Sequence, residues 1–109
     1  MTGKILFYCQ HLLGIGHLRR AATLARALAL SGHEVMLVSG GEPVPHLDCA
    51  PAELVQLPPV RAVDKFFKVL VDERGTRIDD AFKQARAEKL VALFNELEPD
   101  VVLTEMFPF

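Results

Sequence analysis

Residues 4–39 alternate between short apolar runs and one amphipathic segment, and this alternation constrains the fold more than any other feature. Residues 4–9 are an almost continuous apolar run, which is typical of a strand buried on both faces of a parallel sheet. A glycine-containing loop follows, and residues 18–31 then place apolar side chains at helical spacing. Gly32 predicts the end of this helix, and residues 34–39 predict a second buried strand.

Three further segments complete the pattern. Residues 53–57 and 100–105 predict a third and a fourth strand. Between them, residues 77–97 predict a long helix that ends before a proline. Residues 65–71 fit either a helical turn or a short outer strand, and residues 72–75 predict a turn. The expected apolar face of the long helix consists of Ile78, Phe82, Ala85, the stem of Lys89, Leu90, Leu93, Phe94 and Leu97.

This element order predicts an α/β fold, a Rossmann-like parallel sheet of order 3-2-1-4 with flanking helices, because right-handed crossovers leave few other arrangements. The strand order would reverse between the first and fourth strands. Ligands of such sheets bind at this reversal, beyond the carboxyl ends of the strands. The loop at residues 10–17 and the strand end at Thr104 and Glu105 should therefore share one cleft.

Composition limits the class of protein. At 109 residues the chain is one domain or part of one, and its net charge of −2 gives no sign of a nucleic-acid-binding surface. Cys9 and Cys49 are too few for a disulfide framework, which predicts a cytoplasmic protein with free thiols. No run approaches the roughly 18 apolar residues of a membrane span, so no transmembrane segment is expected, while a peripheral membrane contact stays open.

The last residues, 106–109, include three large apolar side chains. Domains rarely end on exposed phenylalanines, because nothing then covers them. We therefore expect residues 1–109 to be an N-terminal fragment of a longer protein. The alternative is a complete small domain whose tail packs back or dimerises.

The loop before the first helix has the character of an anion site. The backbone of Gly14, Ile15 and Gly16 leads into a helix N-terminus, where free N–H groups attract negative oxygens. Arg19 and Arg20 follow in the first turn, where cations oppose the helix dipole. A bound phosphate would explain both the glycines and the arginines, whereas a solvated face would explain the arginines alone.

Two common phosphate motifs fit poorly. The loop has Arg19 where a dinucleotide fingerprint has its third glycine, and Ser39-Gly40-Gly41 where it has an acidic residue. A P-loop is excluded because no Gly-Lys-Ser/Thr follows.

The loop matches a different pattern. Gly14-Ile15-Gly16-His17 at the end of a strand, the alanine-rich helix of residues 18–28 and then Gly32-His33-Glu34-Val35 occur in this order. This arrangement resembles the N-terminal half of glycosyltransferases with two facing Rossmann-like domains, the GT-B fold. It is most similar to the group around the N-acetylglucosaminyltransferase of peptidoglycan synthesis. Pro99-Asp100-Val101-Val102 adds to the resemblance, although the loop has fewer glycines than the fullest members.

The resemblance implies a hexosyl or N-acetylhexosaminyl transferase whose acceptor-side domain is residues 1–109 and whose C-terminal donor-binding domain is absent. This part alone would be inactive. The co-substrates would be a nucleotide-diphosphate sugar and an acceptor hydroxyl, with no cofactor and no metal. His17 would be the base that takes the acceptor proton, and Glu105 is the second choice. The residues implied to bind substrate or phosphate are Gly14, Ile15, Gly16, Arg19, Arg20 and Thr104.

Simpler interpretations stand beside this one. His17 could cap the helix, and Glu105 could bond the loop backbone. His11 is expected to be a solvated loop residue and Cys9 a core residue; these side chains match no standard metal-ligand pattern. Gly40–Gly41 could be a plain turn or leave room for an acceptor. The competing functions are a non-catalytic nucleotide- or phosphate-binding Rossmann-like module and a module that acts through a partner chain.

Overall fold

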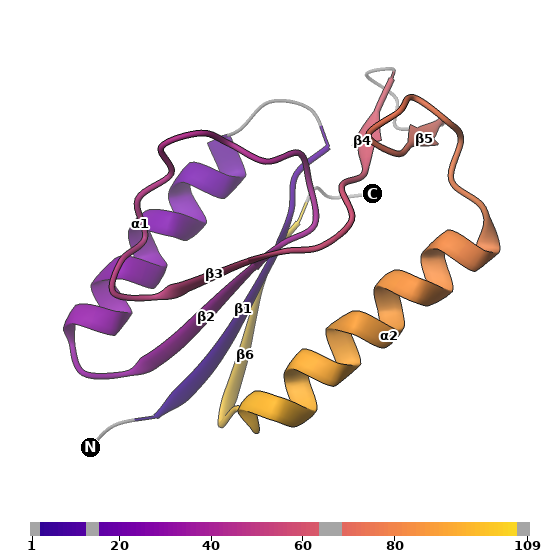
Figure 1. Ribbon diagram of the computed structural model, residues 1–109. Helices are drawn as coiled ribbons and strands as arrows, with labels where there is room; N and C mark the ends of the chain where they lie inside the picture. The colour runs from indigo at the N-terminus through magenta and orange to yellow at the C-terminus, as the bar shows by residue number, and fades with distance from the viewer. Residues whose placement is uncertain (1–2, 13–15, 64–68, 107–109) are drawn as a thin grey trace.

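The computed structural model describes residues 3–12, 16–63 and 69–106. Its centre is a four-stranded parallel sheet of order β3-β2-β1-β6. Helix α1 covers one face of this sheet and α2 the other (Figure 1). The predicted Rossmann-like α/β fold is confirmed, since these are the four predicted strands in the order 3-2-1-4. The elements are β1 (Lys4–Gln10), α1 (Gly16–Leu30), β2 (Glu34–Ser39), β3 (Glu53–Gln56), β4 (Arg61–Ala62), β5 (Leu70–Val71), α2 (Asp80–Leu97) and β6 (Val101–Met106).

Strand β1 is paired on both sides, with β2 and with β6. Successive side chains of a strand point to opposite faces of a sheet. Ile5, Phe7 and Cys9 accordingly pack in the cluster under α1, while Leu6 and Tyr8 lie in the cluster under α2. Both faces of β1 are covered, and this explains its nearly continuous apolar sequence.

Helix α1 lies close to the sheet because its buried stripe consists mostly of alanine. Leu18, Ala21, Ala22 and Ala25 are buried against the strands. The helix ends where Gly32 predicted it would. Gly32 has a φ of 101°, and the following N–H of His33 donates to the carbonyl of Leu28 at 3.3 Å. Such a left-handed residue after the last turn suits glycine, which has no Cβ to strain.

Helix α2 starts later than the predicted Arg77. Asp79 is the N-cap, with extended backbone, and its carboxylate accepts the N–H of Phe82 at 2.8 Å. Arg77 instead forms a β-bridge with Val71, and this bridge keeps the preceding chain extended. A cap side chain satisfies a backbone N–H of the first helical turn, so the helix begins directly after it, and Asp79 therefore sets the boundary.

The face that α2 buries also differs from the prediction. Leu90, Leu93 and Leu97 pack on the sheet as expected, but Ala85, Lys89 and Phe94 are exposed. Ile78 and Phe82 also pack as expected, against the cluster of Leu12, Val60 and Ala62. Between Phe82 and Leu90 the buried face is continued by Arg86, which hydrogen-bonds to the end of the sheet. The helix is therefore rotated so that a polar side chain continues the apolar stripe.

A two-stranded antiparallel hairpin, β4-β5, lies beyond the carboxyl edge of the main sheet (Figure 1). Of the two alternatives for residues 65–71, the short strand is correct at residues 70–71, and residues 64–68 lie outside the described residues. The predicted turn at residues 72–75 is confirmed, with Gly75 N–H donating to the carbonyl of Asp72. Within the described ranges, neither helix combines the length and apolarity needed to cross a bilayer.

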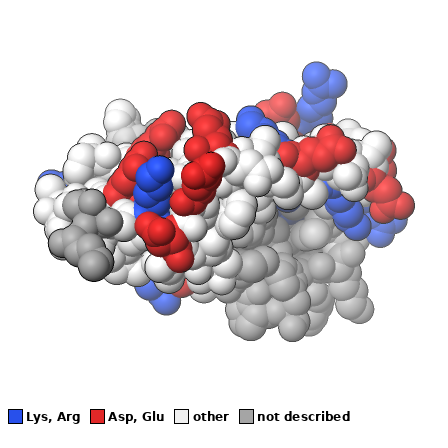
Figure 2. Space-filling view, turned by 90° about the horizontal axis from the view of Figure 1, so that it is seen from below, with Lys and Arg blue, Asp and Glu red and all other residues white. Residues whose placement is uncertain are grey.

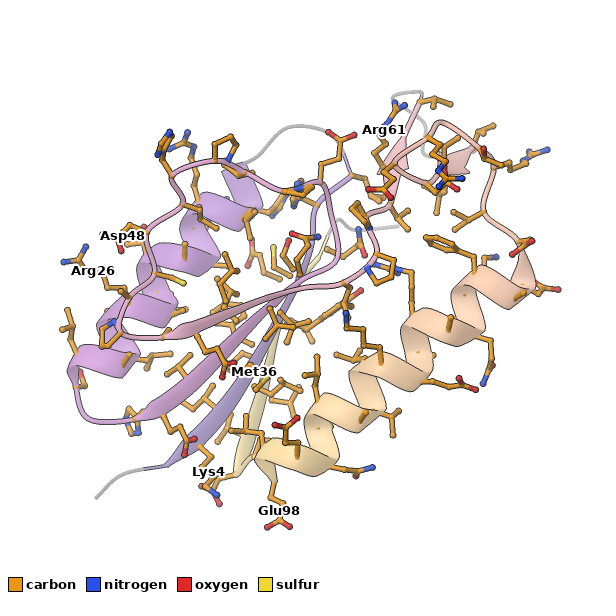
Figure 3. The ribbon with its side chains drawn as sticks, viewed as in Figure 1. Lys4, Arg26, Met36, Asp48, Arg61 and Glu98 are labelled. Carbon is orange, nitrogen blue, oxygen red and sulfur yellow. The ribbon has the colours of Figure 1, made fainter. Side chains whose placement is uncertain are left out.

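The amino edge of the sheet carries mostly acidic side chains. Glu34 and Glu53 begin β2 and β3, and Glu98 and Asp100 precede β6, all of them exposed. Figure 2 views this side and shows acidic groups gathered around a few basic ones. Lys4 and Glu98 lie at this edge, whereas Arg61 lies at the opposite one (Figure 3). An anionic ligand is therefore disfavoured at the amino edge.

The close packing of α1 predicts intolerance to larger side chains. Ala25→Leu should lower the free energy of unfolding by roughly 1–3 kcal/mol, because Ala25 is fully buried against the sheet and added methylenes overpack it. Ala27→Leu on the exposed side of the same helix should change it by less than about 0.5 kcal/mol. Urea unfolding of both variants measures this, and equal losses would contradict the packing described.

Candidate functional site

The carboxyl ends of β1 and β6 lie side by side, and a histidine–carboxylate pair is formed there. Cys9 and Glu105 are register partners in the sheet, and His17 belongs to the first turn of α1. Nδ1 of His17 and Oε1 of Glu105 are 2.7 Å apart, with side-chain exposures of 26% and 23%. A carboxylate only accepts hydrogen bonds, so Nδ1–H is the donor. The structure thus brings together the two residues named as base candidates.

Arg19 and Arg20, which follow one another near the start of α1, make different contacts. Nη1 of Arg20 lies 3.3 Å from the same Oε1 of Glu105, and its side chain is 69% exposed. Arg19 instead lines a shallow hollow on the other side of the helix, together with His46 and Asp48. The positive charge of Arg20 is unfavourable near the positive end of the helix dipole, and the carboxylate of Glu105 offsets part of this cost.

The remaining predicted positions fall in three places. Gly14 and Ile15 lie outside the described residues. Gly16 is the exposed first residue of α1, and a Cβ built on it meets no atom of the described residues within 4 Å. Thr104 is exposed and pairs with Tyr8, so it faces α2, whereas its neighbour Glu105 faces α1. The strand alternation therefore does not bring Thr104 to His17.

Beneath the pair lies a buried polar layer on the α1 side. Burial, and then the charge of Glu105, raises the pKa of the Cys9 thiol to about 11, so this thiol stays protonated. His11 is 4% exposed, which corrects the expectation of a solvated residue, and neither of its ring nitrogens makes a hydrogen bond of normal geometry with the described residues. Burial lowers the pKa of His11 below 6.5, although the backbone and charge of Glu42 oppose the shift. Its ring is therefore neutral at neutral pH.

A hydrogen-bond network occupies the opposite, α2 side of the same edge. Nη2 of Arg86 donates to Oε1 of Gln10 at 2.9 Å and to the carbonyl of Gly40 at 2.8 Å. Nε of Arg86 donates to the carbonyl of Pro58 at 2.9 Å, and the hydroxyl of Tyr8 donates to Gln10 at 3.0 Å. One guanidinium thus joins α2 to the ends of β1 and β2 and to the segment after β3.

These two polar groups explain the double glycine after β2. A Cβ on Gly40 would overlap Oε1 of Gln10 and lie 2.6 Å from Nη2 of Arg86. A Cβ on Gly41 would overlap the ring of His11 and lie 2.6 Å from its carbonyl oxygen. The glycines therefore make room for protein side chains, and neither alternative from the sequence, a plain turn or acceptor space, describes them fully.

Other hollows lie apart from the pair. One of about 520 Å³ lies between the segment after β3, the turn before α2 and the helix itself, and none of its lining residues is a predicted site residue. Among the described residues, no cluster of three or more His, Cys, Asp or Glu side chains could hold a metal ion.

Comparison of this chain with protein-family models, with curated proteins and with solved structures finds no match. The function must therefore be argued from the site. Sequence reasoning missed Gln10, His11 and Arg86. A partial signal existed for Gln10 and His11, because polar residues that directly end a buried strand must find room at the sheet edge. Arg86 carried no such signal, because an arginine on a helix is usually solvated.

The double glycine yields a direct test. Gly41→Ala should lower the free energy of unfolding by roughly 1–3 kcal/mol, because the new methyl group overlaps a buried ring and a backbone oxygen. Gly16→Ala is the matched control and should be neutral or stabilising by up to about 1 kcal/mol, since a Cβ there meets no described residue and alanine favours helix. Denaturant melts measure both, and a neutral Gly41→Ala would refute the steric account.

His11 predicts a pH dependence of stability. Its folded pKa is lowered, so below about pH 6.5 the unfolded chain binds a proton there that the folded chain resists. Above that pH both states are neutral at this site and the effect vanishes. The free energy of unfolding of the wild type, relative to that of His11→Leu, should therefore decrease as pH falls from 8 to 5. The control is His46→Asn at an exposed ring, and a pH-independent difference for His11 would show that its burial has no electrostatic cost.

Proposed function

We propose that this chain is the N-terminal, acceptor-binding part of a glycosyltransferase that moves a sugar from a nucleotide-diphosphate donor to an acceptor hydroxyl. The observation that supports it is the contact between His17 and Glu105 at 2.7 Å, at the point where strand order reverses. In α/β sheets this crevice is where ligands bind. A donor-binding C-terminal domain would complete the cleft.

The pair has the geometry of an oriented general base. Because Glu105 accepts Nδ1–H of His17, the neutral ring carries its lone pair on Nε2. The acceptor hydroxyl would pass its proton to Nε2 while its oxygen bonds to the anomeric carbon. The bond from that carbon to the diphosphate breaks, and the nucleoside diphosphate leaves with the electron pair. Glu105 acts here as a positioning residue rather than as the base itself.

The start of α1 supplies positive potential for the leaving diphosphate. No described residue comes within 4 Å of a Cβ at Gly16, beside the first helical N–H groups, which attract phosphate oxygens. Arg20 is mostly exposed and holds Glu105 only at 3.3 Å, so it can turn to a phosphate. The scheme asks for no cofactor and no metal.

A second candidate is a non-catalytic nucleotide- or phosphate-binding module. The observation in its favour is that Glu105 contacts both His17 and Arg20, which also fixes the start of α1 without any chemistry. The two functions differ in what loss of His17 should do.

The decisive measurement is turnover of the full-length protein against stability. His17→Ala should lower kcat by roughly 10²–10⁴-fold, the usual contribution of a general base, while melting temperature changes little. Glu105→Gln should lower kcat less. The amide oxygen of glutamine can still accept the Nδ1–H of His17, and only the negative charge that orients the ring is lost. Release of nucleoside diphosphate from a panel of nucleotide-diphosphate sugars is the readout.

Arg26→Gln is the matched control, because it breaks only the exposed pair of Arg26 and Asp48, which face one another in Figure 3. It should leave kcat and melting temperature unchanged. Parallel losses of activity and melting temperature in His17→Ala would assign His17 a structural role. Undiminished turnover in that variant would reject the proposal.

A further inference from the structure

The guanidinium of Arg86 carries a charge that no described carboxylate balances. Its Nε and both hydrogens of Nη2 are used by Pro58, Gln10 and Gly40, whose acceptor atoms are all neutral oxygens. No carboxylate of the described residues lies within 4.0 Å of its nitrogens, and the two hydrogens of Nη1 have no partner among these residues. A half-buried cation without a counter-ion favours the approach of an anion.

Beside this group lies a small cavity, the β1–α2 hollow. Its volume is about 210 Å³, and it is lined by Tyr8, Leu57, Lys83, Arg86, Ala87 and Leu90. Pockets for whole drug-sized ligands occupy roughly 300–1,000 Å³. The β1–α2 hollow is therefore of a size for one small group rather than for a nucleotide.

The charge of this hollow is one-sided. Lys83 and Arg86 are three residues apart on α2, so they lie on the same face of the helix and repel one another. Three other hollows each contain at least one carboxylate: Asp72 in the hollow of about 520 Å³, Glu34 in one near the amino edge and Asp48 in one beside α1. In the β1–α2 hollow, two cations and a phenol converge with no acidic lining residue.

We propose that the β1–α2 hollow is an oxyanion-binding site that takes a phosphate or carboxylate group. Nη1 of Arg86 can donate two hydrogen bonds, and Lys83 supplies a second charge from an exposed position. The carbonyl of Gly40 and the side chain of Gln10 hold the guanidinium in place, so little side-chain entropy is lost on binding. The site lies on the face of the sheet opposite His17 and does not depend on the proposed transferase activity.

The test is a residue-resolved titration of the chain with inorganic phosphate. Two-dimensional ¹H–¹⁵N NMR at constant ionic strength, with chloride as the balancing anion, separates specific binding from screening. We expect saturable shifts of the Arg86 Nε–H signal and of the Lys83 and Ala87 amides. A parallel titration with acetate shows whether phosphate or carboxylate is preferred, and saturable binding of either supports the site.

Lys83→Gln should weaken the binding by about threefold or more, as expected for loss of one partly solvated charge pair. This variant keeps the fold, because the Lys83 side chain makes no hydrogen bond or ion pair with the described residues. Lys4→Gln removes the same charge at the opposite edge (Figure 3) and should leave the affinity unchanged. Shifts that do not saturate, shifts confined to α1, or equal affinity in wild type and Lys83→Gln would overturn the proposal.

Discussion

The pairing of β1 with a parallel neighbour on each side is the constraint on which the rest of the molecule depends. Because both of its edges are hydrogen-bonded, β1 cannot turn about its axis, and its side chains alternate strictly between the faces. At its carboxyl end this sends Cys9 towards α1 and Tyr8 and Gln10 towards α2. The carboxyl edge therefore consists of two polar regions separated by one strand.

The two helices are held to this sheet in different ways. Helix α1 approaches closely on an alanine stripe, so dispersion and apolar burial hold it along most of its length. Helix α2 buries only Leu97 fully, and in its first half it is held by the packing of Phe82 and by the hydrogen bonds of Arg86. A guanidinium turned inward requires several acceptors to offset its lost hydration, and the carbonyls of Gly40 and Pro58 and the side chain of Gln10 supply them. This requirement sets the rotation of α2 about its axis.

The fold could be predicted from the sequence because its signals are local and mutually consistent. The apolar runs, Gly32 and the amphipathic helix each fix one element, and right-handed crossovers then leave few sheet orders. The same connectivity anticipated that Glu105 would lie near His17. It could not anticipate that Thr104 would face away, because a strand shift of one residue reverses every side chain.

The polar contacts at the sheet edge could not be predicted in the same way. Arg86 and Gln10 are 76 residues apart, and nothing near either residue indicates its partner. His11 resembled a solvated loop residue, but the segment after β2 passes over it at Gly41 and buries it. In both cases tertiary packing buries a side chain whose polarity would otherwise place it in solvent. The start of α2 is the opposite case, because a local interaction, the cap at Asp79, sets the helix boundary.

The two glycines after β2 also restrict which changes this chain can accept one at a time. Gly40 is matched to Gln10 and Gly41 to His11, each through the volume that the missing Cβ leaves to its partner. A side chain at position 41 would meet the carbonyl oxygen of residue 11 whatever residue stands there, so this position requires glycine. A side chain at position 40 would need changes at both Gln10 and Arg86. Homologues are thus expected to keep glycine at position 41 and to change positions 10, 40 and 86 together.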